Sequence, residues 1–223
     1  MAEPTSEDKT TRKRRRDPER TREAIMEVAG KLMAKDGPEG LSVSEVAQLA
    51  GVNRGTAYHH YQTREQLVKA TTEWVSQKLC AEVFGSGKDM EGAPRDPQTV
   101  IEKLSLFAME NPEFGRAWLF EVLSSSQPAS DPFWNQFKTH IDEFVKTDYA
   151  LPGVDSEVHA VLMLVGVFLW PVWARSHATT ESERRKMAQR FTREVMRQNL
   201  YGTMCRDKFP ELVASLAGEG GDQ

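Results

Sequence analysis

One segment restricts the possible folds of this chain more than any other. It covers residues 41–67 and reads LSVSEVAQLAGVNRGTAYHHYQTREQL. Ser42 with Glu45 has the spacing of a capping box, which marks a helix start, and apolar residues then follow at helical spacing. Gly51 suits the residue that ends this helix, and Asn53 suits the cap of a second short helix. Two short helices joined by a glycine-containing turn are typical of a helix-turn-helix, whose second helix enters the DNA major groove.

The second helix carries side chains that suit DNA recognition. Arg54 can reach guanine or phosphate, Thr56 can meet a thymine methyl group, and Gly55 keeps the helix slim. Tyr58, His59 and His60 follow and can donate hydrogen bonds near the DNA backbone. Alternatively, Tyr58 or Tyr61 is part of the protein core. The candidate DNA-binding residues are Ser42, Ser44, Asn53, Arg54, Gly55, Thr56, Tyr58, His59, Thr63 and Arg64.

The adjacent pair His59 and His60 does not predict a metal site. Neighbouring helical residues point about 100° apart, and no third ligand lies nearby in the sequence. We therefore expect no metal here.

Residues 52–67, VNRGTAYHHYQTREQL, resemble the N-terminal domain of TetR-type transcriptional repressors, whose consensus runs roughly V-s-k-G-t-l-Y-x-y-F-p-s-K-e-e-L. Arg54 and Arg64 replace the usual lysines and keep their charge. Tyr61 replaces phenylalanine, and Gln62 replaces a common proline. These departures leave the fold expectation intact and leave the preferred bases open.

Charge is distributed unevenly along the chain, whose net charge is −4. Residues 1–70 carry 13 Lys and Arg against 11 Asp and Glu, whereas the remainder carries 16 against 22. The basic run Arg12–Arg16 is by itself typical of a solvated tail. Because it directly precedes a DNA-binding domain, we expect Arg14, Arg15 and Arg16 to contact phosphates or the minor groove.

Helix signals divide the chain into segments. We predict a disordered basic tail over 1–16, a three-helix DNA-binding domain over 17–63, and a connecting helix over 64–84. Asp96-Pro97, Asn111-Pro112 and Asp131-Pro132 each place a cap before proline, which predicts helices over 97–110, 112–124 and 132–149. Further helices are expected near 155–177, 181–201 and 206–217, within a helical effector-binding and dimerisation domain over 85–217. Residues 218–223 form a tail. The predicted fold is all-α with about ten helices.

Several other classes of protein are disfavoured by the sequence. It has no uninterrupted run of some 20 apolar residues and no apolar segment near its start, so neither a membrane span nor a secretory signal is predicted. Cys80 and Cys205 lie far apart, which favours a reducing cytoplasm. The fragment Gly85-Ser86-Gly87-Lys88 lacks the rest of a phosphate loop, and enzyme motifs are absent. We therefore expect no catalytic residues and no cofactor.

The middle helices of the C-terminal domain are rich in aromatic residues. For any one of these residues, ordinary core packing is the simpler interpretation. The resemblance to TetR-type proteins implies instead that some of them line a cavity for a small effector, and this lining favours an apolar or aromatic molecule. The candidate ligand-binding residues are Phe107, Met109, Phe114, Trp118, Phe137, His140 and Phe144.

Residues 158–174, VHAVLMLVGVFLWPVWA, are apolar almost all around the predicted helix. Such a helix must be covered on every side, which one domain of this size cannot do alone. With the following helix it is our candidate homodimer interface, as the resemblance also implies. The candidate interface residues are Met163, Val167, Trp170, Met187, Phe191 and Val195.

Together these features predict a TetR-like homodimer that binds a palindromic operator in double-stranded DNA. A repressor released by a small apolar effector is the favoured hypothesis. An activator, or a regulator controlled by another macromolecule, is the first alternative. A helical small-molecule carrier or enzyme is the alternative from another class.

Overall fold

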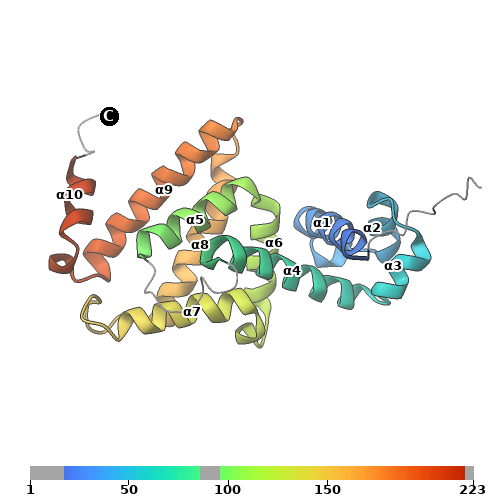
Figure 1. The fold of residues 1–223 in the computed structure, drawn as a ribbon, viewed down its shortest axis with the longest axis horizontal. Helices are drawn as coiled ribbons and strands as arrows, with labels where there is room; N and C mark the ends of the chain where they lie inside the picture. Colours follow the sequence, from blue (N-terminus) through green and yellow to red (C-terminus); the bar gives the residue numbers. More distant parts are fainter. Residues whose placement is uncertain (1–17, 86–95, 219–223) are drawn as a thin grey trace, which may run out of the picture.

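The computed structural model describes residues 18–85 and 96–218. Within these ranges the chain forms ten α-helices and three short 3₁₀ helices, and the β-structure is limited to an isolated bridge between Ala150 and Met204 (Figure 1). The prediction of an all-α fold with about ten helices is confirmed. The expected disordered tail over 1–16 with its arginines, residues 86–95, and residues 219–223 of the expected C-terminal tail lie outside the described residues.

Three helices form the N-terminal domain, with α1 over Pro18–Asp36, α2 over Val43–Leu49 and α3 over Arg54–His60. A 3₁₀ turn, η1 (Pro38–Gly40), joins α1 to α2. Gly51 has φ of 64°, the left-handed conformation expected at the turn between α2 and α3. The core of this domain is aliphatic and includes Ile25, Met26, Ala29, Met33, Leu41, Val46, Ala47 and Leu67.

Helix α4 (Arg64–Phe84) belongs to both halves of the molecule. Its first turns bury Leu67 and Val68 in the N-terminal core, whereas Val75 and Leu79 are buried in the C-terminal core. The Thr63 hydroxyl accepts a hydrogen bond from the Gln66 amide at 3.2 Å and so caps the helix. A displacement in one core can therefore be carried to the other along a continuous helix.

The C-terminal domain contains the six remaining helices. They are α5 (Pro97–Glu110), α6 (Pro112–Ser124), α7 (Pro132–Val145), α8 (Ser156–Ala174), α9 (Glu181–Gly202) and α10 (Pro210–Gly218). α8 is long and apolar enough to cross a membrane by length and composition alone. However, it contacts α5, α6, α7 and α9, as expected for the central helix of a folded domain.

Three predicted helices have different limits in the structure, and one of them, α8, ends at Ala174 rather than near residue 177. α7 ends at Val145 rather than near residue 149, because Thr147 directs both its amide and its hydroxyl to the Phe144 carbonyl, closing a tight turn. The helix expected over 206–217 is divided into η4 (Arg206–Lys208) and α10. Pro210 disfavours helical geometry at Phe209, whose φ is −127°.

Candidate functional site

Helix α3 projects from the end of the N-terminal domain and is anchored by one small side chain. Ala57 is 1% exposed, and the other six residues of the helix are all exposed. The Asn53 side chain accepts a hydrogen bond from the Gly55 amide at 2.8 Å, which caps the helix as predicted. The exposed residues include the candidates Arg54, Gly55, Thr56, Tyr58 and His59. α3 thus has the exposure that a helix needs to enter a DNA groove.

A polar cluster on this surface joins α3 to α2. Ser44 Oγ accepts hydrogen bonds from Arg54 Nε at 2.9 Å and Nη2 at 2.5 Å, and it lies 3.0 Å from the Tyr58 hydroxyl. We call these three residues the Ser44 cluster. Ser42, in contrast, makes no side-chain cap, so the predicted capping box of α2 does not form.

The two tyrosines of this segment have different environments. Tyr61 is 7% exposed and its hydroxyl donates to Met26 Sδ at 3.9 Å, whereas Tyr58 is 42% exposed. Tyr61 is therefore the core residue, and Tyr58 remains available to a partner.

In the part of the chain that the structure describes, no group of three His, Cys, Asp or Glu residues is arranged to hold a metal ion.

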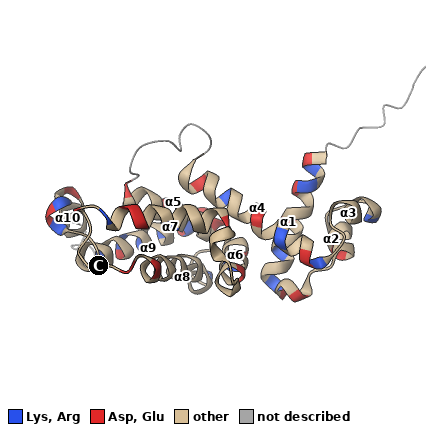
Figure 2. Cartoon of the chain, turned by 90° about the horizontal axis from the view of Figure 1, so that it is seen from below, with Lys and Arg blue, Asp and Glu red and all other residues tan. Residues whose placement is uncertain are grey.

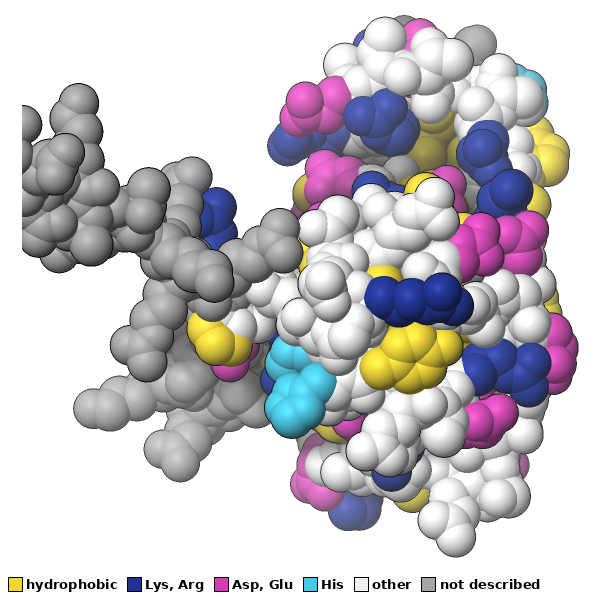
Figure 3. All heavy atoms as spheres, turned by 90° about the vertical axis from the view of Figure 1, so that its right-hand side faces the viewer, with side chains coloured by type: hydrophobic (Ala, Val, Ile, Leu, Met, Phe, Trp, Pro, Cys, Tyr) yellow, Lys and Arg dark blue, Asp and Glu magenta, His cyan; other side chains and the backbone are white. Residues whose placement is uncertain are grey.

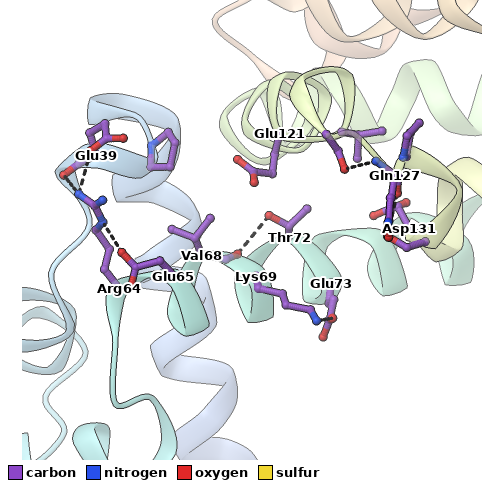
Figure 4. Close-up of a pocket in the computed structure, with 15 residues that line it drawn as sticks. Glu39, Arg64, Glu65, Val68, Lys69, Thr72, Glu73, Glu121, Gln127 and Asp131 are labelled. Carbon is purple, nitrogen blue, oxygen red and sulfur yellow. Dashed lines mark hydrogen bonds and ion pairs between the residues drawn. The ribbon is translucent and has the colours of Figure 1, made fainter.

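Arg64 points away from the exposed surface of α3 and toward η1. Its Nη1 lies 2.9 Å from Glu39 Oε2, and its Nε lies 3.5 Å from Glu65 (Figure 4). The charge of this candidate DNA-binding residue is thus paired within the protein. The hydroxyl of Thr63, another candidate, is used to cap α4.

The folded part of the N-terminal domain is not strongly basic. Residues 18–63 contain five Lys and Arg against six Asp and Glu. Both signs of charge occur along the helices, and Lys and Arg lie near hydrophobic and histidine side chains on the end view (Figures 2 and 3). The folded domain therefore has no excess of positive charge with which to attract DNA phosphates.

A cleft of about 550 Å³ separates the two domains beside α4 (Figure 4). Its walls come from η1, the first half of α4, the end of α6 and the segment around η3 (Pro128–Ser130). Lys69 pairs with Glu73 at 4.0 Å, and Asp131 accepts a hydrogen bond from Ser76 at 2.9 Å. The cleft leaves space between the domains on this side of α4.

The domains are in direct contact between α1 and α6. The Phe114 ring lies against Gly30, where an added Cβ would be 2.6 Å from Cε1, and it meets Trp74 edge-on with centroids 5.5 Å apart. Arg116 donates a hydrogen bond to the Ala34 carbonyl in the last turn of α1. Phe114, a candidate ligand-binding residue, therefore lies at the interdomain contact.

The remaining ligand-binding candidates are divided between the core and a small cavity. Phe107 and Trp118 are buried in the core, and Trp118 Nε1 donates to Asp131 at 3.1 Å. Met109 belongs to a separate cluster with Ala174 and Ala188. A cavity of about 30 Å³ lies among α5, α7, α8 and α9, and the candidates that line it are Phe137, His140 and Phe144.

Besides His140, the polar lining of this cavity comes from helices that the aromatic pattern did not indicate. His159 of α8 and Asn199 of α9 line it, and neither side chain has a hydrogen-bond partner among the described residues. Burial lowers the pKa of His159 from its ordinary value, which favours the neutral imidazole. His159 stands near the start of the apolar α8 and Asn199 near the end of the mostly polar α9, and neither position gave a sequence signal that it faces a cavity.

An apolar surface runs along α8, but two of the predicted interface residues do not belong to it. Met163 and Val167 are 8% and 1% exposed and face the core of the subunit. The outward face instead carries a stripe of large apolar residues, namely Val158, Leu162, Leu169, Val172 and Trp173. Because α8 is apolar all around, its sequence has no polar face that would mark the solvent side. The sequence therefore did not show which residues of α8 face outward.

Partly buried aromatic residues extend this surface toward α9. Trp170 stacks on Trp173 with centroids 5.0 Å apart, contacts Phe191 at 5.6 Å, and donates from Nε1 to the Met187 carbonyl. Phe191 covers Gly166, where an added Cβ would lie 3.3 Å from its ring. Trp170, Met187, Phe191 and Val195 thus keep part of their surface exposed beside the α8 stripe.

Comparison with known proteins supports the same interpretation of the N-terminal domain. Residues 25–71 match the model of the family described as bacterial regulatory proteins, tetR family. The chain is 28% identical over 114 residues to the HTH-type transcriptional regulator AcrR of Shigella flexneri. The aligned segment covers 50% of this chain and 52% of that protein. The chain thus spans about half the length of the curated relatives it matches.

Solved structures resemble the whole chain at low identity. A bacterial regulatory protein of the tetR family from Rhodococcus RHA1 has a TM-score of 0.60 at 21% identity, over 79% of this chain and 95% of that one. The structure of AibR in complex with isovaleryl coenzyme A and operator DNA has a TM-score of 0.58 at 19% identity, over 77% and 96%. These similarities establish a shared fold.

A helix-turn-helix unit with an exposed second helix, followed by a larger helical domain, defines the architectural class of this protein. Within that class, residues 25–71 have the N-terminal segment of the tetR family of bacterial regulatory proteins, and the described chain shares the fold of a solved regulator of that family.

Proposed function

We propose that the protein is a homodimeric transcriptional regulator that binds a palindromic operator through α3 and acts as a repressor. The observation that carries this proposal is the exposure of every residue of α3 except Ala57, with Arg54 held at its surface by Ser44. Arg54 suits guanine or phosphate recognition, and Thr56 suits contact with a thymine methyl group or a phosphate. The curated relatives are named as transcriptional regulators and not as enzymes, and a cytoplasmic location follows from this role.

The exposed stripe on α8 supports dimerisation. Leu162 is 65% exposed, and the large side chains of the stripe lie beside the half-buried Phe191 and Trp170. A two-fold contact through α8 and α9 would cover this surface with its own counterpart. Dimerisation would also place two copies of α3 about one helical turn of DNA apart, roughly 34–36 Å, as a palindromic site requires.

Release by a small effector is supported by the way the domains are joined. α4 runs through both cores, and α6 contacts α1 through Phe114 and Arg116. A ligand that changes the arrangement of the C-terminal helices would therefore shift the N-terminal domain, and the cleft beside α4 leaves room for that movement. AibR, which shares the fold, was solved with both an acyl-coenzyme A and operator DNA.

Selection from fragmented genomic DNA tests the proposed function directly. The full chain should enrich a small set of fragments, and Arg54→Ala should strongly reduce the enrichment. Lys103→Ala, a substitution of an exposed basic residue of α5, is the matched control and should enrich the same fragments. Enrichment no different between wild type and Arg54→Ala would contradict the role given to α3.

A further inference from the structure

The cavity among α5, α7, α8 and α9 has two chemically different sides. Val100 and Ile101 from α5, with Phe137 and Phe144 from α7, provide an apolar and aromatic side. His159 from α8 and Asn199 from α9 provide hydrogen-bonding groups. An apolar pocket with a few convergent polar groups is the usual form of a small-molecule site.

Two of the polar groups that line this cavity have unused hydrogen-bonding capacity. The side chains of His159 and Asn199 have no hydrogen-bond partner among the described residues, although His159 is half-buried. A neutral imidazole offers one N–H donor, and the asparagine amide offers two. Because these donors are not engaged within the protein, a ligand that accepts them gains hydrogen bonds without displacing existing ones.

The lining also restricts the charge of a ligand. None of the twelve residues that line the cavity is Lys, Arg, Asp or Glu. A buried carboxylate ligand would find no fixed cation, and a buried amine would find no carboxylate. Since burying an unpaired charge is far more costly than burying a neutral carbonyl group, the lining favours an uncharged molecule.

From this geometry we propose that the cavity binds a small uncharged molecule with an apolar body and one carbonyl oxygen, which accepts hydrogen bonds from His159 and Asn199. This inference rests on the proposed function, because it names the effector class of a ligand-controlled regulator. The apolar body lies between the α5 and α7 side chains, and the carbonyl group is directed toward α8 and α9.

Binding requires the cavity to widen. Its volume of about 30 Å³ holds about one water molecule, whereas ligand sites usually enclose roughly 300–1,000 Å³. Met163 has three rotatable side-chain bonds, and Phe144 is only partly buried, so these two walls are the ones that can move. Movement of Met163 displaces the inner face of α8, whose outer face carries the proposed dimer surface. Ligand entry is thereby linked to the relative position of the two subunits.

Calorimetry with three probes of equal chain length tests this proposal on the full-length protein without DNA. The probes are 2-octanone, octanoate and octylamine, which are neutral, anionic and cationic near pH 7. We expect 2-octanone to bind with a Kd at least tenfold lower than either charged probe. Comparable or tighter binding of octanoate or octylamine, or no saturable binding of 2-octanone, would overturn the proposal.

Substitutions locate the bound ketone. His159→Leu and Asn199→Leu keep an apolar lining of similar size, and each should weaken 2-octanone binding at least tenfold with an unchanged helical circular dichroism spectrum. Ser125→Ala, in the interdomain cleft, is the control and should bind as the wild type does. Unchanged ketone binding in both leucine variants would refute the assigned site.

The outcome is separable from that of the proposed function. If the protein does not bind 2-octanone but still enriches DNA fragments in a way that depends on Arg54, only the assigned ligand class is contradicted. Ketone binding without any selective DNA binding contradicts the proposed regulator.

Discussion

Ser44 Oγ on α2 accepts two hydrogen bonds from the Arg54 guanidinium on α3, at 2.9 Å from Nε and 2.5 Å from Nη2. The contact joins the two helices of the helix-turn-helix at their exposed surface and limits the rotamers of a long side chain. A side chain that is already ordered loses less conformational entropy when it meets a ligand. We therefore expect Ser44 to contribute to DNA binding by positioning Arg54.

Substitutions in the Ser44 cluster should have graded effects. Arg54→Ala should weaken specific DNA binding by about 1–3 kcal/mol, the range for a good contact between a side chain and a base. Ser44→Ala should weaken it less, because Arg54 is retained but less ordered. The two effects should be less than additive when combined, as anisotropy titrations of both single variants and the double variant would show. Strict additivity would contradict the positioning role.

Removal of residues 1–16 should reduce the salt dependence of DNA binding. The folded residues 18–63 contain more acidic than basic side chains, so the run Arg12–Arg16 carries much of the local positive charge. The slope of log K against log salt should become shallower by about 0.9 for each phosphate that the protein no longer neutralises. Titrations at several salt concentrations measure this slope. An unchanged slope would show that the run does not bind phosphates.

Leu162→Glu should convert the proposed dimer to a monomer. Leu162 is the most exposed apolar residue of the α8 stripe, and a charge there would be buried between subunits without a partner. Light scattering should report half the mass of the wild type. Leu49→Glu places the same charge on a similarly exposed leucine of α2 and should leave the mass unchanged. A dimeric Leu162→Glu variant would exclude this face as the interface.

Gly30→Ala should destabilise the contact between α1 and α6. The added Cβ would lie 2.6 Å from the Phe114 ring, and such overpacking typically costs about 1–3 kcal/mol. Gly202→Ala, with nothing within 4 Å of its added Cβ, is the control and should retain stability. Denaturant titrations give both free energies of unfolding. In a Phe114→Leu background, the penalty of Gly30→Ala should largely disappear, and its persistence would contradict the assigned clash.

Glu183 should make folding stability sensitive to acid. Hydrogen bonds from the Thr180 and Thr179 backbone amides lower its pKa to about 2. The folded-state pKa of Glu183 is below the ordinary 4.5. The ionised carboxylate therefore contributes its full stabilisation of the folded state above pH 4.5, and this stabilisation is lost as pH falls toward 2. Thermal unfolding of Glu183→Gln should therefore lose less stability than wild type over this interval. Parallel losses in the two proteins would contradict the assignment.

Some sequence signals predicted the structure more reliably than others. Proline after a cap residue gave the start of α5, α6 and α7 correctly, because proline has a fixed φ and lacks the amide that a first turn leaves unpaired. A capping box of Thr180 and Glu183 starts α9, whereas Ser42 makes no cap at the start of α2. Motif spacing thus places helices better than it identifies individual hydrogen bonds.

The locations of candidate site residues were less predictable. The exposed α3 follows from its motif, but Arg64 turns to Glu39, a partner 25 residues away that only the fold brings close. In the same way, the cavity combines residues from four helices, so the aromatic pattern of α5 to α7 did not indicate His159 or Asn199. Contacts between distant segments determine these features.

Fluorescence anisotropy on the fragment most enriched from genomic DNA tests the proposed DNA-binding role of α3 most directly. We predict selective binding of two protomers per site, affinity that falls steeply with salt, and loss of selectivity in Arg54→Ala. Binding of the wild type no tighter than to random DNA of equal length, or selective binding that survives Arg54→Ala, would contradict this role.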